Sequence, residues 1–449
     1  MIDRGRLQTL LQQERELFAE RNPRSRQAYE QADNLFGRVP MTWMNKRAGG
    51  FPLYLATARA ARVTDLDGHE YVDLCLGDTG AMAGHSPAPV VAAVQRRIGE
   101  SGGLTAMMPT EDAAWVGAEL SRRFGLPYWS FSLTATDANR WAMRLARALT
   151  GRSKILFHSY CYHGSVDESL IVLGDGTPMS RPGNVGAPCD VLQTSRVAEI
   201  NDLPGLEREL RHGDVAAVLI EPALTNIGIV LPEPGYLAGV RQLTQRYETL
   251  LIHDETHTFS AGPGGATGLW HLDPDVVTIG KAIAGGVPCG AYGLSASLAE
   301  RALSRTDLDL VDMGGVGGTL AGNPVSMAAA RACLGEVLTD EAFARMVSLT
   351  TNLTESLRRS IAEHSVPWSV SQLGARVEYR FADPAPRNGT ESNAAHDGEL
   401  DDFMHLFTAN RGVLLTPFHN MALTCPETTE ADVDAYAEVF ADALRHLVG

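Results

Sequence analysis

The sequence predicts an α/β protein with a mostly parallel central sheet in a large domain, plus a smaller α+β domain built from the N- and C-terminal segments. Three observations lead to this fold class. The 449 residues exceed what one small core needs. In the middle of the chain, short runs that are apolar throughout alternate with helix-periodic segments, as in strands buried on both faces and joined by helices. After about residue 322 the pattern becomes a mixture of helices and isolated strands.

The N-terminal segment, residues 1–80, is predicted to form the first part of the small domain. Residues 1–35 are charged and helix-periodic and predict a helix. Residues 37–55 predict an irregular segment. The alternating stretch 62–76, with an Asp67-Gly68 turn, predicts a small hairpin.

Residues 81–322 are predicted to form the large domain. The stretches 87–100 and 110–125 have helical spacing. Strands buried in the sheet are predicted for five apolar runs at 154–158, 216–222, 249–255, 276–281 and 290–295. Because helical segments separate these runs, the strands are expected to be mostly parallel.

Residues 323–449 are predicted to complete the small domain. A long helix is expected to start near Asn323, and a second helix is expected at the C-terminus. The stretch 383–399 is polar and rich in turn-forming residues, so we expect a mobile loop there.

Composition excludes several classes of protein. The net charge of −16, from 38 basic and 54 acidic residues, argues against nucleic acid as a partner. No stretch reaches the roughly 18 apolar residues of a membrane span, and the N-terminus lacks the apolar core of a signal peptide. We therefore expect a cytoplasmic protein that does not contact a membrane. The six cysteines include no C-x-x-C pair, which predicts reduced thiols.

Two candidate catalytic residues follow neighbouring strands. Asp254 ends the run at 249–255, and Lys281 ends the run at 276–281. In open parallel sheets, ligands bind beyond the carboxyl ends of the strands. A lysine forms a Schiff base with an aldehyde cofactor, and a carboxylate stabilises the protonated ring nitrogen that makes pyridoxal 5'-phosphate (PLP) an electron sink. The pair therefore predicts PLP as the cofactor.

A phosphate cradle and a stacking ring complete this hypothesis. Thr134, Ala135 and Thr136 are small or hydroxylic and open an evident helix, whose first N–H groups favour an anion. Tyr162 and His163 follow the strand at 154–158. We expect an aromatic ring from this stretch to stack on the cofactor.

The stretch 253–257 also has two histidines four residues apart, as in some zinc sites. That arrangement needs a helix, so that both histidines share one face. Here the segment ends a strand, where neighbouring side chains point to opposite sides. We therefore predict no metal site.

Four motifs in a fixed order resemble the class III aminotransferases of the PLP-dependent fold type I superfamily. They are LTATDAN (133–139), YCYHG (160–164), HDETHTF with VVTIGKAIAGG (253–259 and 276–286), and GGTLAGNP (317–324). The resemblance covers nearly the whole chain. It is closest to the branch that contains glutamate-1-semialdehyde aminomutase and the β-amino-acid and amine transaminases.

The resemblance implies roles for the cofactor residues. Lys281 would form the internal aldimine and then move a proton between substrate and cofactor. Asp254 would pair with the pyridine nitrogen. Tyr162 would stack on one face of the ring, and Thr256, where relatives usually carry valine, would pack on the other. Thr319 would reach the phosphate of the partner subunit, which implies a homodimer with active sites at the interface.

The phosphate loop departs from the family pattern. Relatives usually read Ser-Gly-Thr-Glu-Ala, whereas this chain reads Thr134-Ala135-Thr136-Asp137-Ala138. Alanine lacks the backbone freedom of glycine. The resemblance implies that Ala135 and Thr136 bind the phosphate, in a slightly rebuilt cradle.

Substrate recognition departs from the family as well. In the β-amino-acid relatives an arginine lies in the N-terminal irregular segment, and here Trp43 takes its place. His419 stands where other relatives offer an arginine near the C-terminus. Because arginine binds carboxylates in bidentate fashion, these losses predict a pocket lined by Trp43, Met44 and Met82 that favours an apolar amine. The alternative is that Arg47 binds a carboxylate.

The predicted function is a homodimeric PLP-dependent transaminase. It would move an amino group between an amine or ω/β-amino substrate and a keto acid or ketone acceptor by a ping-pong mechanism. The alternative on the same fold is an aminomutase of the glutamate-1-semialdehyde type, which needs no second acceptor, or else an amino-acid racemase. A cofactor-free binding or regulatory protein is a different class, and the intact Lys281 and Asp254 pair argues against it.

Overall fold

The computed structural model describes residues 2–46, 48–308, 310 and 318–449. The chain folds into two compact units. The first contains residues 1–86, 344–385 and 395–449, and the second contains 87–343 and 386–394. The predicted domain boundaries at residues 80 and 322 stay a prediction. The compact units divide at residues 86 and 343, and the second unit also includes residues 386–394.

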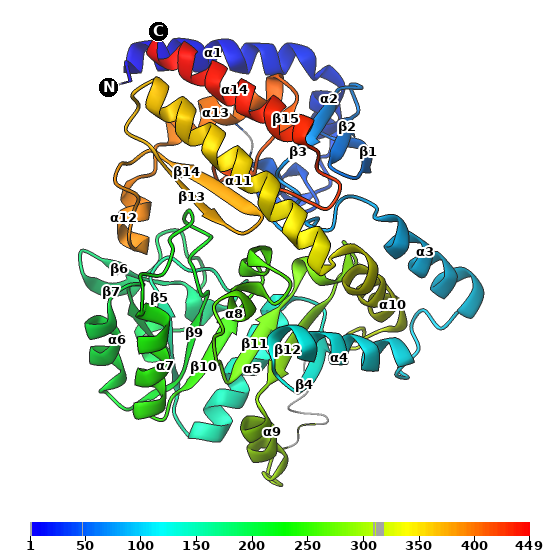
Figure 1. Cartoon of the computed structure of the whole chain (residues 1–449), viewed down its shortest axis with the longest axis vertical. Helices are drawn as coiled ribbons and strands as arrows, with labels where there is room; N and C mark the ends of the chain where they lie inside the picture. Colours follow the sequence, from blue (N-terminus) through cyan, green and yellow to red (C-terminus); the bar gives the residue numbers. More distant parts are fainter. Residues whose placement is uncertain (1, 47, 309, 311–317) are drawn as a thin grey trace. The chain divides into compact units, whose positions relative to one another are not determined.

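The second unit is built on a mixed sheet that has seven strands in the described part of the chain (Figure 1). In sheet order the strands are β4 (Tyr128–Ser132), β12 (Gly290–Leu294), β11 (Val276–Ile279), β10 (Leu250–Asp254), β9 (Val215–Ile220), β5 (Lys154–His158) and β8 (Ser195–Ala198). Strand β12 runs antiparallel to both β11 and β4, and the other neighbouring pairs are parallel. The mostly parallel sheet predicted from the sequence is therefore confirmed.

Each of the five predicted apolar runs overlaps one strand. Every residue of β9 and β10 is buried, and these strands lie in the main apolar cluster of the second unit. The sequence did not predict β4 and β8, which are the two edge strands. Their sequences, YWSFS and SRVA, lack an uninterrupted apolar run, because an edge strand is less enclosed than a central one.

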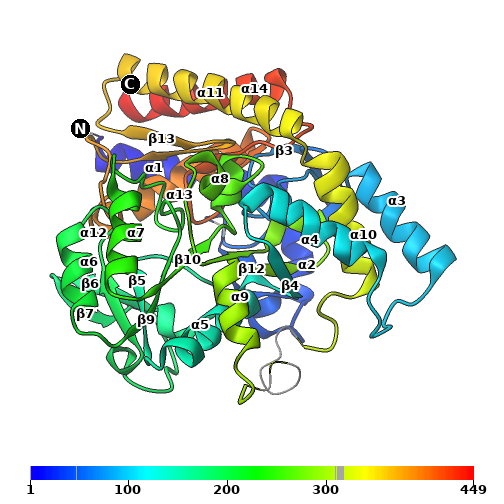
Figure 2. The same cartoon turned by 60° about the horizontal axis from the view of Figure 1, so that its bottom comes forward.

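Helices and a second small sheet complete this unit. The helices are α3 (Ala88–Arg96), α4 (Glu111–Phe124), α5 (Ala135–Thr150), α6 (Leu203–Leu210), α7 (Tyr236–Arg246), α8 (Gly265–Leu269), α9 (Ala296–Leu303), α10 (Pro324–Ala332) and α12 (Gly389–Ala394). The small sheet pairs β6 (Ile171–Gly174) with β7 (Thr177–Ser180). Helices α3 and α10 lie side by side in both views (Figures 1 and 2).

The long helix expected to start near Asn323 is present and runs from Pro324 to Val337. Asn323 caps α10 through its side chain, and Pro324 occupies the first turn, where proline loses no hydrogen bond. The α-helix ends at Ala332 and continues as one π-helical turn, Cys333–Val337.

The prediction of a mobile loop at 383–399 is wrong. Residues 389–394 form α12, and Arg387 makes an ion pair with Glu233 at 2.5 Å. The backbone N–H of Gly389 donates to Glu199 at 3.0 Å. The polar side chains that suggested a loop are used for contacts within the second unit, which composition alone does not reveal.

The first unit contains five α-helices in its described part. They are α1 (Arg4–Arg21), α2 (Pro23–Gln31), α11 (Asp340–Glu363, which starts before the unit boundary at residue 343), α13 (Gly398–Asn410) and α14 (Glu430–Val448). The single N-terminal helix expected over 1–35 is two helices, because the chain breaks at Asn22, before Pro23. The C-terminal helix is confirmed, and Thr429 and Asp432 form its capping box.

Two small sheets belong to the first unit. One has the order β1 (Leu55–Arg59), β2 (Arg62–Asp65), β3 (Glu70–Asp73) and β15 (Val413–Leu414). The other has the order β13 (Ser369–Leu373), β14 (Arg376–Arg380) and β16 (Met421–Leu423). The predicted hairpin is confirmed as β2 and β3, with Gly68 at φ 91° in its turn.

Two further findings concern the described residues as a set. None of their helices combines the length and the apolarity that crossing a membrane requires. The six cysteines are free thiols, of which all but the half-buried Cys189 are buried.

Candidate active site

Asp254 and Lys281 lie at the carboxyl ends of neighbouring parallel strands, as the sequence predicts. Asp254 is the last residue of β10 and pairs with Thr278 of β11. Lys281 follows β11 and starts the short 3₁₀-helix η7 (Lys281–Ala284). Its backbone has φ 49°, a left-handed conformation that strains a residue other than glycine and is frequent at functional sites.

A buried hydrogen-bond network holds the Asp254 carboxylate, which is 3% exposed. Its Oδ2 accepts from Asn139 Nδ2 at 2.8 Å and lies 2.9 Å from His163 Nδ1. Its Oδ1 accepts from the backbone N–H of Thr256 at 3.0 Å. Asn139 is itself held, because Thr278 Oγ1 donates to its Oδ1 at 2.6 Å. The carboxylate is therefore fixed by groups from α5, β11 and the loop after β5.

This network keeps Asp254 ionised. Burial opposes the charged carboxylate, but the hydrogen bond and the charge of His163 outweigh burial and lower the pKa of Asp254 from 3.8 to about 2. Burial likewise opposes the imidazolium of His163. The neighbouring Cys161 sulfur and the Asp254 carboxylate outweigh it, and the pKa of His163 lies well above 6.5. The pair is a buried ion pair at neutral pH.

The candidate phosphate residues lie beside the residue that precedes Lys281. Thr134 caps α5 by accepting from the N–H of Asp137, so Ala135 and Thr136 occupy the first turn. A Cβ atom on Gly280 would lie 2.9 Å from the Ala135 nitrogen. The helix start, with its free N–H groups, therefore touches the backbone next to the lysine.

The loop after β5 closes the other side of this turn. A Cβ atom on Gly164 would lie 1.9 Å from Thr136 Oγ1, and Gly164 has φ 81°. Glycine is needed there both for the space and for the backbone conformation. The YCYHG motif is thus locked against the start of α5.

Tyr162 precedes His163 in the chain, and Thr256 lies two residues after Asp254. Tyr162 is 41% exposed although both of its neighbours are buried. Thr256 is buried, and its Oγ1 forms no hydrogen bond with any described residue. The Nε2 atom of His163 is buried in the same way without a hydrogen-bond partner among the described residues. Thr319 is exposed and lies two residues after the stretch 311–317, which is outside the described part of the chain.

The residues present fit PLP on chemical grounds. A lysine amine, an ionised carboxylate and a helix start with free N–H groups match the aldehyde, the ring nitrogen and the phosphate of this cofactor. The buried, unpaired Thr256 hydroxyl marks a place beside the carboxylate where a ligand could contact the protein.

Three residues of this network were not among the predicted site residues. Asn139 binds Asp254 directly, and Thr278 binds Asn139. The third residue is His257, whose Nε2 lies 2.9 Å from Lys281 Nζ. Asn139 could have been found from the sequence, because it is a polar residue in the second turn of α5 on a helix face that is otherwise apolar. For His257 the sequence offers only the zinc pattern, which the strand at Leu250–Asp254 argues against.

His253 lies apart from this network. Its Nδ1 contacts Thr267 Oγ1 of α8 at 3.0 Å, whereas Asp254 contacts α5. Burial lowers the pKa of His253 to about 3, so its ring is neutral. Among the described residues, no group of three or more histidine, cysteine or acidic side chains is arranged to hold a metal ion.

The predicted substrate residues belong to the first unit. Trp43 is 36% exposed and packs edge-on against Phe418, with ring centroids 5.3 Å apart. Met44 is exposed, whereas Met82 is fully buried. His419 is buried beside Phe418. Arg47 lies outside the described residues.

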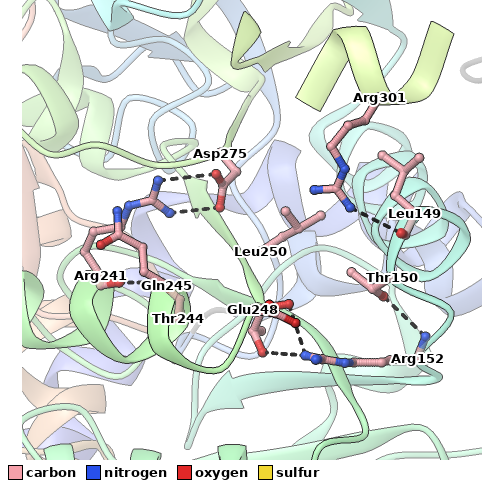
Figure 3. A pocket seen from close by; sticks show the side chains of 11 residues that line it. Leu149, Thr150, Arg152, Arg241, Thr244, Gln245, Glu248, Leu250, Asp275 and Arg301 are labelled. Carbon is pink, nitrogen blue, oxygen red and sulfur yellow. Dashed lines mark hydrogen bonds and ion pairs between the residues drawn. The ribbon is translucent and has the colours of Figure 1, made fainter. Parts of the chain in front are cut away.

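A hollow of about 500 Å³ lies at the opposite end of the strands (Figure 3). It is lined by Leu250, the first residue of β10, and by Asp275, which precedes β11. Arg241 forms an ion pair with Asp275 at 2.9 Å, and Arg152 donates to the backbone carbonyl oxygen of Tyr247 at 2.9 Å. Arg301 likewise donates to the backbone carbonyl oxygen of Leu149 at 3.3 Å. The arginines of this hollow thus bind Asp275 or backbone oxygens, and it lies away from Asp254 and Lys281, so it is not the candidate active site.

Comparisons with known proteins agree with this geometry. The family described as Aminotransferase class-III matches residues 43–444. Glutamate-1-semialdehyde 2,1-aminomutase of Anaeromyxobacter dehalogenans is 32% identical over 418 residues, which cover 91% of this chain and 95% of that protein. A glutamate-1-semialdehyde aminomutase variant from Pseudomonas aeruginosa PAO1, solved in complex with PMP, has a TM-score of 0.96 and 46% identity over 99% of each chain. An omega-transaminase from Sphaerobacter thermophilus has a TM-score of 0.85 and 29% identity, covering 96% of this chain and 100% of that one.

The chain therefore belongs to the class III aminotransferase family. It is a PLP-dependent enzyme of the aminotransferase type with the fold of that family.

Proposed function

We propose that this enzyme is an aminomutase of the glutamate-1-semialdehyde type, which moves an amino group between adjacent carbons of one substrate. The observation that carries the proposal is the 46% identity over 99% of the chain to the P. aeruginosa protein solved under that name. The curated relatives of 32–35% identity bear the same name. The transaminase, which was the first prediction from the sequence, becomes the second candidate.

Five residues are proposed to hold the cofactor on this chain. Lys281 binds the aldehyde carbon, and the Asp254 carboxylate pairs with the ring nitrogen. Asp254 stays ionised because His163 binds it and lowers its pKa. The first turn of α5, at Ala135 and Thr136, binds the phosphate, with the Thr134 side chain keeping that turn in place. Bound PLP supplies an electron sink for the carbon that carries the amino group.

Two residues are proposed for the faces of the cofactor ring. Tyr162, exposed between buried neighbours, stacks on one face, and Thr256 packs on the other. Thr319 reaches the phosphate bound by the partner subunit, so the proposal includes a homodimer. The cytoplasmic location also stays a prediction.

The second candidate, a transaminase for an amine or ω/β-amino substrate, is favoured by one feature of the first unit. Trp43 stands where the resemblance places an arginine, and it packs on Phe418. Lys46 Nζ lies 5.7 Å from the centre of the Phe418 ring. An aromatic surface favours an apolar substrate over a free carboxylate, whereas glutamate 1-semialdehyde carries a carboxylate.

One experiment separates the two candidates. The enzyme is first converted to the form that carries pyridoxamine 5'-phosphate (PMP). It is then mixed with glutamate 1-semialdehyde (4-amino-5-oxopentanoate) in the absence of any keto acid or ketone. An aminomutase converts many equivalents into the isomer 5-amino-4-oxopentanoate, because the amino group returns to the same molecule and no acceptor is consumed. If product forms only with an added acceptor, or only simple amines convert the PLP form into the PMP form, the aminomutase proposal is wrong and the transaminase stands.

A further inference from the structure

Arg181, in the second unit, is held against the loop that carries the YCYHG motif. It directly follows β7 and is half-buried. Its backbone N–H donates to the carbonyl oxygen of Leu170 at 2.9 Å, which fixes the base of the side chain. Nη1 of the guanidinium donates to the carbonyl oxygen of Cys161 at 3.1 Å, and the guanidinium carbon lies 5.7 Å from the centre of the Tyr160 ring. Two contacts thus hold the guanidinium group beside this loop.

The positive charge of Arg181 has no acidic partner in the described part of the chain. Arg181 forms no ion pair there, and its Nε and Nη2 atoms donate to no described residue. Because water hydrates a half-buried charge incompletely, an anionic ligand would be favourable at this point. The Nε and Nη2 edge of a guanidinium group presents two parallel N–H groups, which match the two oxygens of a carboxylate. The edge that stays available therefore suits a carboxylate ligand.

The carbonyl oxygen that Arg181 binds belongs to the proposed cofactor site. Cys161 directly precedes Tyr162, the residue proposed to stack on the cofactor ring. His163, two residues after Cys161, lies 2.9 Å from the Asp254 carboxylate. Arg181 is therefore bound to the same short loop that would cover the cofactor ring, so a substrate on that ring would lie nearby.

Other arginines near this loop fit a carboxylate ligand less well. Arg140 of α5 donates to the carbonyl oxygen of Ser165 at 3.1 Å, but Arg140 is exposed, so water screens its charge. Arg147 forms an ion pair with Glu168 at 3.0 Å, so its charge is already balanced. Of these three arginines, Arg181 is the one that is partly buried and has no acidic partner among the described residues.

We propose that Arg181 binds the carboxylate of the substrate and thereby sets a preference for carboxylate-bearing substrates. The inference rests on the proposed function, because glutamate 1-semialdehyde carries a carboxylate. Trp43 and His419 stand where the resemblance expects arginines, and Arg181 supplies a cation from a different segment of the chain. Its Nε and Nη2 edge donates two hydrogen bonds to the carboxylate, while Nη1 keeps its bond to Cys161.

The test compares two substrates that differ in charge alone. The value of kcat/KM for isomerisation without an acceptor is measured for glutamate 1-semialdehyde and for its carboxamide. The enzymes are wild type, Arg181→Met, Arg181→Gln and Arg181→Lys. Calorimetry supplies a second readout that is independent of catalysis, the dissociation constant of 4-oxopentanoate for the PLP-loaded enzyme. This probe has the carboxylate but no amine.

Arg301→Met is the matched control. Arg301 also donates to a backbone carbonyl oxygen, that of Leu149 at 3.3 Å, and forms no ion pair with a described residue. It lines the hollow at the opposite end of the strands. Circular dichroism and the visible absorbance band of bound PLP check that each variant is folded and loaded.

Arg181→Met and Arg181→Gln should lower kcat/KM for glutamate 1-semialdehyde relative to its carboxamide by about tenfold or more, and should weaken 4-oxopentanoate binding by a similar factor. Two uncharged variants are used because either one alone could disturb the loop. Arg181→Lys keeps the charge but not the paired N–H groups, so it should lose less. Arg301→Met should match wild type in both readouts.

Two outcomes separate this inference from the proposed function. An equal loss for both substrates, or an unchanged dissociation constant in a folded Arg181→Met or Arg181→Gln variant, would mean that Arg181 only holds the loop. The inference would then be wrong while the aminomutase stands. If wild type forms no isomer, the aminomutase proposal fails, and the dissociation constants of 4-oxopentanoate alone decide whether Arg181 binds a carboxylate.

Discussion

Replacing the Asp254 carboxylate should reveal how strongly the fold depends on a charge at this point. In Asp254→Asn the side chain keeps its shape but loses the charge that pairs with His163 Nδ1 at 2.9 Å. The pKa of Asp254 falls from 3.8 to about 2 in the folded protein. At about 1.4 kcal/mol per pH unit, this difference corresponds to roughly 2 kcal/mol of stability at pH 7. The uncharged variant should lose about that amount.

The sign of the pH dependence follows from the direction of the shift. A carboxyl pKa that is lowered by folding stabilises the protein above the unfolded pKa of 3.8, and this stability is lost as the pH falls through about 2. The Asp254 contribution to the gap in stability between wild type and Asp254→Asn should therefore shrink below about pH 4. Pairing with Asp254 also raises the pKa of His163, and that contribution is fully present below about pH 6.5 and is lost as the pH rises, so the gap should be largest near about pH 5 to 6. Urea unfolding of the cofactor-free proteins at several pH values measures this gap.

Asp307→Asn is the matched control. The pKa of Asp307 is also lowered to about 2, chiefly by a hydrogen bond from Arg305, but the Asp307 side chain is 64% exposed. Solvent screens an exposed ion pair, so this variant should unfold at the wild-type urea concentration. Equal unfolding midpoints for Asp254→Asn and wild type at pH 7 would refute the argument that the buried network stabilises the second unit through charge.

Three further predictions concern the cofactor and the substrate. Lys281→Ala should leave no PLP attached after borohydride reduction and denaturation, because no other amine is proposed to hold it; labelled PLP found on another lysine by peptide mapping would contradict this. Gly164→Ala should weaken PLP binding at least tenfold by forcing the turn at Thr136 to move. Gly176→Ala, at φ 76° with open space around it, should cost only about 1 kcal/mol of backbone strain and leave PLP binding unchanged; equal PLP affinities for the two variants would refute the packing argument. Trp43→Arg should raise kcat/KM for a carboxylate-bearing substrate relative to a simple amine, and an unchanged ratio would show that Trp43 does not select the substrate.

The sequence predicted the central strands well because burial on both faces demands an unbroken apolar run. Strand β10 was expected at 249–255 and lies at Leu250–Asp254. The edge strands β4 and β8 do not meet that demand and left no such signal. The prediction of a mobile loop at 383–399 was wrong for a different reason. Its polar residues suggested a loop, yet Arg387 and Gly389 bind partners that are distant in sequence.

The positions of Asp254 and Lys281 were also readable from the sequence, because the ends of consecutive apolar runs become neighbours at one edge of a parallel sheet. Their partners were not. His163 lies 91 residues from Asp254 along the chain, and Asn139 lies 115 residues from it. No local pattern links such distant residues, so the sequence could not reveal that the carboxylate is held by two side chains and stays charged.

The sequence by itself determined the fold class, the family resemblance, and which lysine and which acid stand at the ends of adjacent strands. These features depend on local periodicity and on motifs with a fixed order, which a single chain displays directly. Only the tertiary structure decided the charge state of Asp254, the locking of Gly164 against Thr136, and the contact between His257 and Lys281. The physical reason is that hydrogen bonds and pKa shifts depend on distances of a few ångströms between groups that folding alone brings together.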